Sequence, residues 1–420
     1  MPLLNGQLNF IDLFAGCGGL SLGMELAGFT PLFVNELNPD AMNTYLANRR
    51  VNHPLLDRYN IHDVKNLVKN RGKLLQEMIS GLRTDYGVNA KLGEVDLLVG
   101  GPPCQGFSGI GYRRSYSVDK EQLPSNHLYQ DMAFVVHKIK PKIFLFENVR
   151  GLLSAKWTKD GIKGEIWEDV QETFQNIPGY TVQSQLVYAK DYGVPQNRPR
   201  ILLVGIRKDI RVRPTEGLVA GGFLPEPDPN FPNLSDLWGD ILDPQYTNGG
   251  VTKVYPHKAQ NTIQEWFRKD PINGNVYNKG DILTEHEYSN HNQRVVEKFK
   301  FMLKNDGVIP AGMQTKKFAQ RLLSPKWNEE GPNITATSLP DDYVHFEQPR
   351  SLTVREWARL QTFPDWYEFK GKRTTGGIRR AGNPLEGIFD REVPKYTQIG
   401  NAVPVLLAKK VGEHFKTILS

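Results

Sequence analysis

The second of the two cysteines, Cys104, stands in the segment 100–108 (GGPPCQGFS), directly after an apolar run that is typical of a buried strand. The two glycines and two prolines predict a rigid, exposed loop with the thiol at its tip. Such a thiol can act as a nucleophile once it loses its proton, because the thiolate is the reactive form and free cysteine has a pKa of about 8.5. The alternative interpretation is a small buried side chain that only fills space.

Charged side chains at the ends of two other apolar runs suggest partners for this thiol. Glu147 lies in FENV (146–149), where parallel strands would bring it near Cys104 and burial would let its carboxyl act as an acid. Arg198 and Arg200 alternate in QNRPR, and their guanidinium forks suit a phosphate or a nucleobase carbonyl. A strand-end salt bridge and two solvated arginines would give the same pattern.

A glycine-rich turn, DLFAGCGG (12–19), lies between an apolar run and a helical stretch. Its glycines let the backbone approach a ligand closely, and Glu36 closes the next run, where a carboxylate can accept both hydroxyls of a ribose. Because the G-x-G-x-x-G fingerprint is missing, a nicotinamide cofactor is disfavoured and a nucleoside cofactor without a pyrophosphate fits better. A simple tight turn is the alternative.

These residues need a scaffold of strands that end at one edge. Short apolar runs predict buried strands at 10–16, 31–36, 95–100, 142–149, 179–189 and 200–206. Apolar spacing of three and four residues predicts a helix over 126–139, with Ser125 as its N-cap, and another over 404–419. The alternation predicts an α/β fold with a doubly wound, mostly parallel sheet.

Beyond about residue 208 the periodicity weakens, and proline and glycine are frequent. We therefore predict a catalytic and cofactor-binding domain of residues 1–207 plus 395–420, and a smaller, irregular domain of residues 208–394. The run 370–380 (KGKRTTGGIRR) concentrates positive charge, and either a phosphate contact or a solvated loop explains it.

Composition excludes several classes of protein. The chain has 420 residues, 39% of them hydrophobic, and a formal net charge of +6, which excludes a disordered or fibrous protein. It has no apolar stretch of the ~18 residues that a membrane span needs. Two cysteines cannot build a disulfide framework or a thiolate-rich zinc site. We expect a reduced, soluble, cytoplasmic protein without a metal.

Taken in order, six segments carry a family resemblance: FAGCGG (14–19), PPCQGFS (102–108), ENV (147–149), QNRPR (196–200), RSLTVREWARLQTFPDWY (350–367) and QIGNAVP (398–404). Through them the chain closely resembles the DNA (cytosine-5)-methyltransferases of the bacterial restriction-modification type, over nearly its whole length outside the variable region. The resemblance implies the Rossmann-like fold of S-adenosylmethionine-dependent methyltransferases, with the irregular region, roughly 208–345, as the target-recognition domain.

The resemblance also implies a reaction. The Cys104 thiolate would add to C6 of a flipped-out cytosine, Glu147 would stabilise the protonated N3, and C5 would take the methyl group of S-adenosylmethionine. Arg198 and Arg200 would orient the base and its phosphate. Further implied DNA contacts come from Gln105, Ser108, Lys372, Arg373 and Arg379.

By the same resemblance, the residues around the cofactor would be Phe14, Cys17, Gly19, Glu36, Leu37, Asp63, Pro103, Leu128 and Asn401. Leu37 departs from the aromatic residue that some members carry there. The implied partner is double-stranded DNA, and the implied setting is a monomer at the bacterial nucleoid that protects host DNA. A cognate restriction endonuclease would act on the same site without direct contact.

Three alternatives stay open at this point. A nucleobase deaminase also carries a Pro-Cys loop, but Phe107 occupies the position of its second cysteine and no His-x-Glu precedes the loop. A tRNA-directed relative shares the catalytic segments, although the large irregular region favours duplex DNA. A non-catalytic DNA-binding paralogue would have damaged motifs. The DNA target sequence cannot be predicted from this chain.

Overall fold

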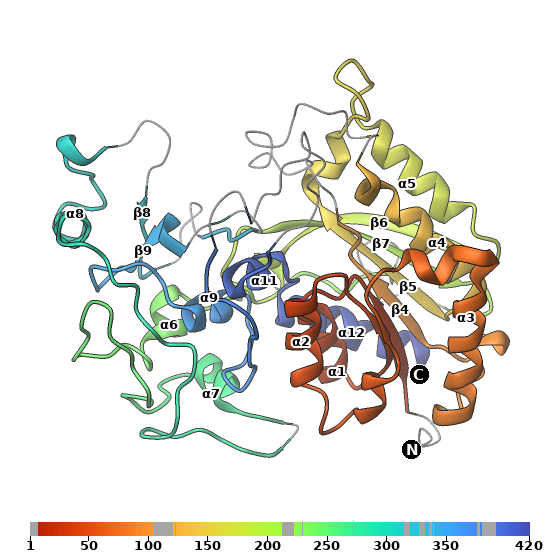
Figure 1. The fold of residues 1–420 in the computed structure, drawn as a ribbon, viewed down its shortest axis with the longest axis horizontal. Coiled ribbons are helices and arrows are strands. Elements are labelled where there is room, and N and C mark those ends of the chain that lie inside the picture. Colours follow the sequence, from red (N-terminus) through yellow and green to blue (C-terminus); the bar gives the residue numbers. More distant parts are fainter. Residues whose placement is uncertain are drawn as a thin grey trace.

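The computed structural model describes residues 7–103, 121, 123–211, 222–228, 230–271, 273–314, 320–326, 332–335, 338, 340–375, 379 and 392–420. The sheet region comprises the described residues of 7–211 together with 395–420, and the second region comprises those of 222–375 (Figure 1). Among the described residues, no helix combines the length and the apolar character that crossing a bilayer requires.

A seven-stranded sheet with the order β3-β2-β1-β4-β5-β7-β6 forms the centre of the sheet region. Its strands are β1 (Asn9–Leu13), β2 (Thr30–Asn35), β3 (Asn60–Ile61), β4 (Leu97–Gly100), β5 (Ile143–Val149), β6 (Tyr180–Tyr188) and β7 (Pro199–Arg207). The first five in spatial order are parallel, and β7 is antiparallel to both of its neighbours. The predicted doubly wound, mostly parallel sheet is confirmed.

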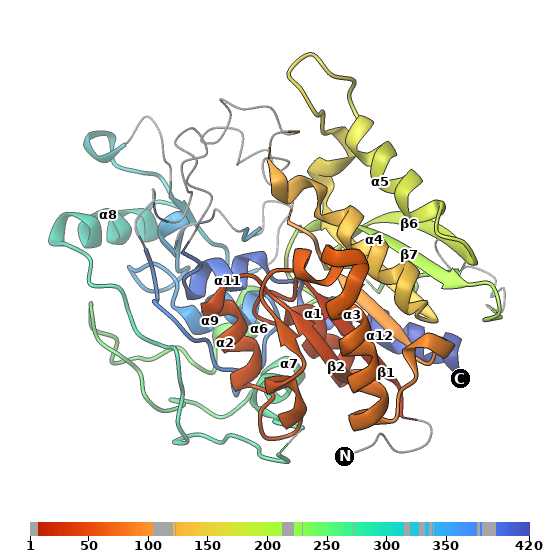
Figure 2. The same cartoon turned by 45° about the vertical axis from the view of Figure 1, so that its right-hand side comes forward.

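Helices cover both faces of this sheet (Figure 1, Figure 2). They are α1 (Gly19–Leu26), α2 (Pro39–Ala47), α3 (Lys65–Tyr86), α4 (Leu128–Ile139), α5 (Glu165–Gln175) and α12 (Val405–Leu419). Side chains alternate along a strand, so Phe144 and Phe146 of β5 pack under α3, α4 and α5 while Ile143 and Leu145 face α1 and α12. The apolar strand β5 therefore contributes side chains to the hydrophobic cores on both faces of the sheet.

The helix predicted over 126–139 exists, but its predicted N-cap is wrong. Ser125 lies inside a 3₁₀ turn, Pro124–His127, and α4 begins after it at Leu128 without a side-chain cap. The C-terminal helix is confirmed as α12, and it packs closely on α1. A Cβ added at Gly23 of α1 would lie only 2.3 Å from that of Ala408, so the glycine permits this contact.

The second region contains few regular elements, as its sequence predicts. These are α6 (Leu234–Trp238), α7 (Thr262–Arg268), α8 (Gln293–Lys304), α9 (Val354–Leu360) and a two-stranded sheet of β8 (Arg321–Leu322) and β9 (Tyr343–Val344). α11 (Lys395–Asn401) returns the chain toward the sheet region. Core side chains such as Trp357 and Tyr367 cluster with Cys17 and Leu22, so the two regions share one packed boundary. The predicted domain limits stay a prediction.

Candidate functional site

The carboxyl ends of four adjacent parallel strands form one edge of the sheet. β2, β1, β4 and β5 are neighbours in that order, so the loops that follow them emerge side by side. Glu36 follows β2, Phe14 follows β1, Gly101 follows β4, and Glu147 lies near the end of β5. This edge is where open α/β sheets bind ligands.

Glu147 and Arg200 form a mostly buried ion pair at this edge. Arg200 Nε lies 2.6 Å from Glu147 Oε1, and their side chains are 9% and 12% exposed. Burial lowers the pKa of Arg200, because it disfavours the charged guanidinium, and Glu147 opposes that shift. A Cβ added at Gly101 would lie 2.9 Å from Glu147 Oε2. The carboxylate therefore lies against the backbone that leads to Cys104.

Asn148, next to this carboxylate, holds the same segment from the other side. Its Nδ2 donates to the carbonyl oxygen of Pro102 at 3.1 Å, and its own side chain is buried. Pro103 is exposed at the end of the described stretch. The predicted nucleophile Cys104 and the predicted DNA contacts Gln105 and Ser108 lie outside the described residues.

Arg198 is fully buried and its hydrogen bonds go to the backbone. It donates to the carbonyl oxygens of Gly400 at 2.8 Å and Ala402 at 2.9 Å, and also to that of Ile334. Burial, together with nearby Arg200, lowers the pKa of Arg198 well below its usual value. The guanidinium thus holds the segment 400–402 and part of the second region against β7. Its predicted contact with the base stays a prediction.

The glycine-rich turn and Glu36 are connected by hydrogen bonds. Gly16 N donates to Glu36 Oε2 at 2.8 Å, and Asn38 N donates to Oε1 at 2.7 Å. Burial raises the pKa of Glu36 despite these two donors. A Cβ added at Gly16 would have no heavy atom within 4 Å, so open space adjoins the turn. A carboxylate beside open space suits hydroxyl groups and a cation, and it repels phosphate.

Two other predicted cofactor residues in this turn are packed rather than open. Cys17 is buried, its Sγ donates to the carbonyl oxygen of Gln398 at 3.4 Å, and burial raises its pKa to about 12. A Cβ added at Gly19 would lie 2.4 Å from the carbonyl oxygen of Val403. A thiol in this state is unreactive, and the predicted contact of Cys17 with the cofactor stays a prediction.

Leu37 and Asp63 lie at the neighbouring strand ends. The β2–β3 register pairs Asn35 with Ile61, which brings the residues after both strands to the same edge. Leu37 is 67% exposed, and Asp63 Oδ1 accepts from Lys65 N at 3.0 Å. Leu128 begins α4, and Asn401 ends α11. Their contacts with a cofactor stay predictions.

The comparisons with known proteins agree with this arrangement. The sequence matches the family model of the C-5 cytosine-specific DNA methylases over residues 8–417. The chain belongs to this family. The methylase is therefore a DNA (cytosine-5)-methyltransferase, and its family implies S-adenosylmethionine as the methyl donor. The deaminase and non-catalytic alternatives are disfavoured.

Relatives of the methylase cover nearly all of its length. It is 32% identical to the Type II methyltransferase M.DdeI of Desulfomicrobium norvegicum, over 97% of this chain and 88% of that protein. It is 30% identical to M1.HphI of Haemophilus parahaemolyticus, over 97% and 86%. A solved structure, a putative DNA modification methyltransferase encoded within a prophage of E. coli, has a TM-score of 0.66 at 24% identity and covers 98% of this chain and 99% of that one. That last likeness supports the fold alone.

The basic stretch of the methylase is partly neutralised by acidic side chains. Lys372 Nζ lies 3.2 Å from Glu392 Oε1, which also lies 4.0 Å from Arg379 Nε. Arg373 Nη1 lies 3.1 Å from Glu287 Oε1. A phosphate would have to compete with these carboxylates, so the predicted DNA contacts of the three cations stay predictions.

Sequence reasoning missed two amides in the methylase site. Asn35 accepts from Phe14 N at 3.2 Å and donates to the carbonyl oxygen of His62 at 2.7 Å, so it joins the turn after β1 to the segment of Asp63. Asn148 donates to the carbonyl oxygen of Pro102 and so joins the end of β5 to the segment after β4. The signal was present, because each amide is adjacent in sequence to a strand-end glutamate. In the described part of the chain, no group of three or more His, Cys, Asp or Glu is arranged to hold a metal.

Proposed function

We propose that this methylase transfers a methyl group to C5 of a cytosine flipped out of a specific duplex DNA sequence, through a covalent bond between Cys104 and C6. The observation that supports it best is the buried Glu147–Arg200 pair beside Gly101, three residues before Cys104. A carboxyl group beside the Gly101 backbone supports a shared role of Glu147 and Cys104 on one pyrimidine ring.

Cytosine C5 is a weak nucleophile, and covalent catalysis overcomes this. In the proposed reaction the Cys104 thiolate bonds to C6, N3 takes up a proton from solvent, and the Glu147 carboxylate stabilises the protonated N3, so the C5–C6 electron pair becomes available at C5. When bound, S-adenosylmethionine supplies an electrophilic methyl group on a sulfonium centre. A base then takes the C5 proton, the Cys104–C6 bond breaks, and N3 returns its proton to solvent.

The two arginines have different parts in this proposal. Arg200 orients Glu147 through their ion pair and offers the rest of its guanidinium to the cytosine O2. Arg198 acts through the segment 400–402, to which it donates. We propose that Glu36 binds the ribose hydroxyls. The remaining cofactor contacts would come from Phe14, Cys17, Gly19, Leu37, Asp63, Pro103, Leu128 and Asn401.

The second region would read the DNA target. Base flipping costs a few kcal/mol, which contacts with the pocket and with phosphates must offset. We propose that Lys372, Arg373 and Arg379 contribute such phosphate contacts. The names of the relatives, which are Type II methyltransferases, support a role in a restriction-modification system. We further propose that the methylase is a monomer and that an endonuclease acts separately on the same site.

The decisive experiment is covalent trapping. Bisulfite sequencing of DNA from an expressing host gives the target, and a duplex with 5-fluorocytosine at that position is then incubated with enzyme and S-adenosylmethionine. Because fluorine replaces the C5 hydrogen and cannot leave as a proton, the Cys104–C6 bond cannot be broken by elimination, and the wild type should form a complex that survives denaturation. Cys104→Ser should form none.

The other cysteine provides the matched control. Cys17→Ser makes the same sulfur-to-oxygen change at a buried position of the proposed cofactor turn, so at saturating S-adenosylmethionine it should still be trapped. Trapping that persists in Cys104→Ser would overturn the proposed nucleophile. Loss of trapping in both variants would point to a general loss of folding, which near-UV circular dichroism would reveal.

A further inference from the structure

Two buried side chains from distant parts of the chain hold the glycine-rich turn from behind. Tyr367 donates its hydroxyl proton to the carbonyl oxygen of Cys17 at 2.5 Å. Arg49 Nη2 donates to the carbonyl oxygen of Gly18 at 3.3 Å, and its Nη1 donates to the Tyr367 hydroxyl at 3.0 Å. Arg49 is 2% exposed and Tyr367 is fully buried. Arg49, Tyr367 and the carbonyl groups of Cys17 and Gly18 thus form one hydrogen-bond network.

Arg49 is itself held in a single orientation. Its Nη2 lies 2.6 Å from Glu25 Oε1, and its Nη1 donates to the carbonyl oxygen of Tyr45 at 3.0 Å. The guanidinium carbon lies 3.8 Å from the centre of the Tyr45 ring. An ion pair, a backbone carbonyl and an aromatic face thus fix the guanidinium, which adds rigidity to whatever it contacts.

The backbone conformation of the turn leaves room for Arg49 and Tyr367. Gly18 has φ +87°, a conformation that other residues rarely adopt, and it directly precedes α1. A Cβ added at Gly18 would lie 2.8 Å from both Arg49 Nη1 and the Tyr367 hydroxyl oxygen. On its other side the turn adjoins open space at Gly16 and the carboxylate of Glu36. One side of the turn is therefore clamped and the other is free to receive a ligand.

We propose that Arg49 and Tyr367 are positioning residues for the cofactor, which fix the Cys17 and Gly18 carbonyls and so hold the turn in its ligand-receiving conformation. This inference rests on the proposed cofactor site at the turn. Neither side chain touches the reacting atoms. Tyr367 also packs against Phe363 and Phe369 in the core that the second region contributes, so the cofactor turn is tied to the packing of the region that reads DNA.

The test is the affinity of the full-length enzyme for S-adenosylhomocysteine, measured by isothermal titration calorimetry. Tyr367→Phe removes one hydroxyl and leaves the Cys17 carbonyl without its donor, so Kd should rise about tenfold. At saturating S-adenosylmethionine, kcat should stay within about twofold of the wild type. KM for DNA should not change, because Tyr367→Phe keeps the ring and its packing against Phe363 and Phe369.

Tyr180→Phe is the matched control. Tyr180 is also buried and also donates to a backbone carbonyl at 2.5 Å, that of Pro141, in a different part of the sheet region. It should lose comparable stability in a thermal melt and keep the wild-type Kd. An equal loss of affinity in both variants, or no loss in Tyr367→Phe, would overturn the proposal.

Arg49→Lys keeps the charge beside Glu25 but loses the fork, so it should also weaken binding. Combined with Tyr367→Phe, it should have a less than additive effect, because the two residues act as a unit. Additive effects would contradict a shared clamp. Glu36→Ala distinguishes failure of the proposed cofactor site from failure of the proposed clamp. If Glu36→Ala leaves Kd unchanged, the proposed cofactor site is wrong. If Glu36→Ala raises Kd strongly and Tyr367→Phe does not, only the clamp is overturned.

Discussion

In the sheet region, the side chains buried between β4, β5 and the flanking helices are apolar: Leu98, Phe144 and Phe146 on one face and Ile143 and Leu145 on the other. In the second region, four fully buried arginines lie in the core: Arg268, Arg350, Arg355 and Arg359. The sheet satisfies its backbone through the strand ladders, whereas irregular segments leave carbonyls that need other donors. In the second region, other hydrogen-bond donors must therefore replace the strand ladder.

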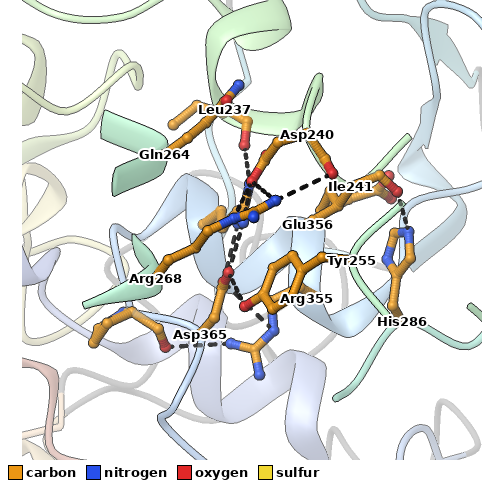
Figure 3. A network of polar contacts seen from close by, with 12 residues as sticks. Leu237, Asp240, Ile241, Tyr255, Gln264, Arg268, His286, Arg355, Glu356 and Asp365 are labelled. Atoms are coloured by element: carbon orange, nitrogen blue, oxygen red, sulfur yellow. Dashed lines mark hydrogen bonds and ion pairs between the residues drawn. The ribbon is translucent and has the colours of Figure 1, made fainter. Parts of the chain in front are cut away.

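Arginine supplies that replacement, as the network in Figure 3 shows. Arg359 pairs with Asp240 and Asp365 at 2.5 Å each, and it also donates to the carbonyl oxygen of Leu237. Arg268 pairs with the same Asp240 at 2.7 Å and donates to a further carbonyl oxygen, that of His257. Each guanidinium has five N–H donors, so one side chain can satisfy a carboxylate and a backbone group together. Buried charge thus organises a region that has little secondary structure.

The largest expected effect comes from breaking this network. Arg359→Met keeps most of the volume but leaves Asp240 and Asp365 buried with one partner fewer, so unfolding free energy should fall by about 3–5 kcal/mol. Urea denaturation followed by tryptophan fluorescence measures this, because Trp238 and Trp357 are buried in the same core.

An exposed ion pair provides the control for that experiment. Arg50 lies 3.1 Å from Asp57 Oδ1, with side chains 59% and 50% exposed, so Arg50→Met should cost no more than about 1 kcal/mol. If Arg359→Met were equally mild, the second region would be held by its aromatic packing, and the contrast between the two cores would fail.

A smaller effect should appear in the pH dependence of stability. A buried carboxyl in each region has a shifted pKa, and the two shifts have opposite signs. Burial raises the pKa of Asp12, whose Oδ2 accepts from Ser21, to about 7. Burial would also raise the pKa of Asp365, but Arg359 and Arg355 hold it below its usual value. Asp12 therefore binds its proton more tightly in the folded state, and Asp365 binds its proton less tightly.

The direction of each pH effect on stability follows from the linkage between proton binding and folding. The contribution of Asp12 is fully present below about pH 4 and is lost as the pH rises toward 7, whereas that of Asp365 is present above about pH 4 and is lost in acid. Asp12→Asn should remove on the order of 1–3 kcal/mol from the difference in unfolding free energy between pH 5 and pH 8. Urea titrations at both pH values test this, and an unchanged difference would show that Asp12 is ionised in the folded protein.

The strand-end residues could be predicted from the sequence because strands have a simple period and direction. Apolar runs located β1, β2, β4 and β5, and parallel order placed Glu147 beside the Gly101 backbone. The ion pair between Glu147 and Arg200 depends on one further fact, the antiparallel register of β5 and β7, in which Val149 faces Arg200. The sequence of either segment alone does not predict which residue of the other strand it pairs with.

Contacts of the second region could not be predicted, because no period links their partners. Arg198 of the sheet region donates to the carbonyl oxygen of Ile334 in the second region, 136 positions away in the sequence. The segment 354–360 (VREWARL) has charged residues that suggest an exposed helix face, yet every residue of α9 is buried. Its arginines are satisfied by residues such as Asp240 and Thr284, which only the folded chain brings near.

The smallest expected effect concerns how helices begin in the two regions. In the described part of the sheet region, α1, α3, α4, α5 and α12 start without a side-chain cap and pack on the sheet, whereas α2 is capped by Asn38, which accepts from Ala41 N. In the second region, α7, α8 and α9 begin with side chains that accept from the first turn: Asn261, Asn292 and Thr353. Helices without a sheet beneath them need local stabilisation.

Asn292→Ala tests this on α8, which buries only Phe299 and Met302. Asn292 Oδ1 accepts from Val295 N at 3.0 Å, so its loss should cost about 1 kcal/mol and lower the hydrogen-exchange protection of α8 about fivefold. Lys300→Ala, an exposed change in the same helix, should leave protection unchanged. Equal protection in Asn292→Ala and the wild type would mean that packing of Phe299 and Met302 alone holds α8, as packing on the sheet holds α4. The difference between the two regions would then be confined to their buried charges.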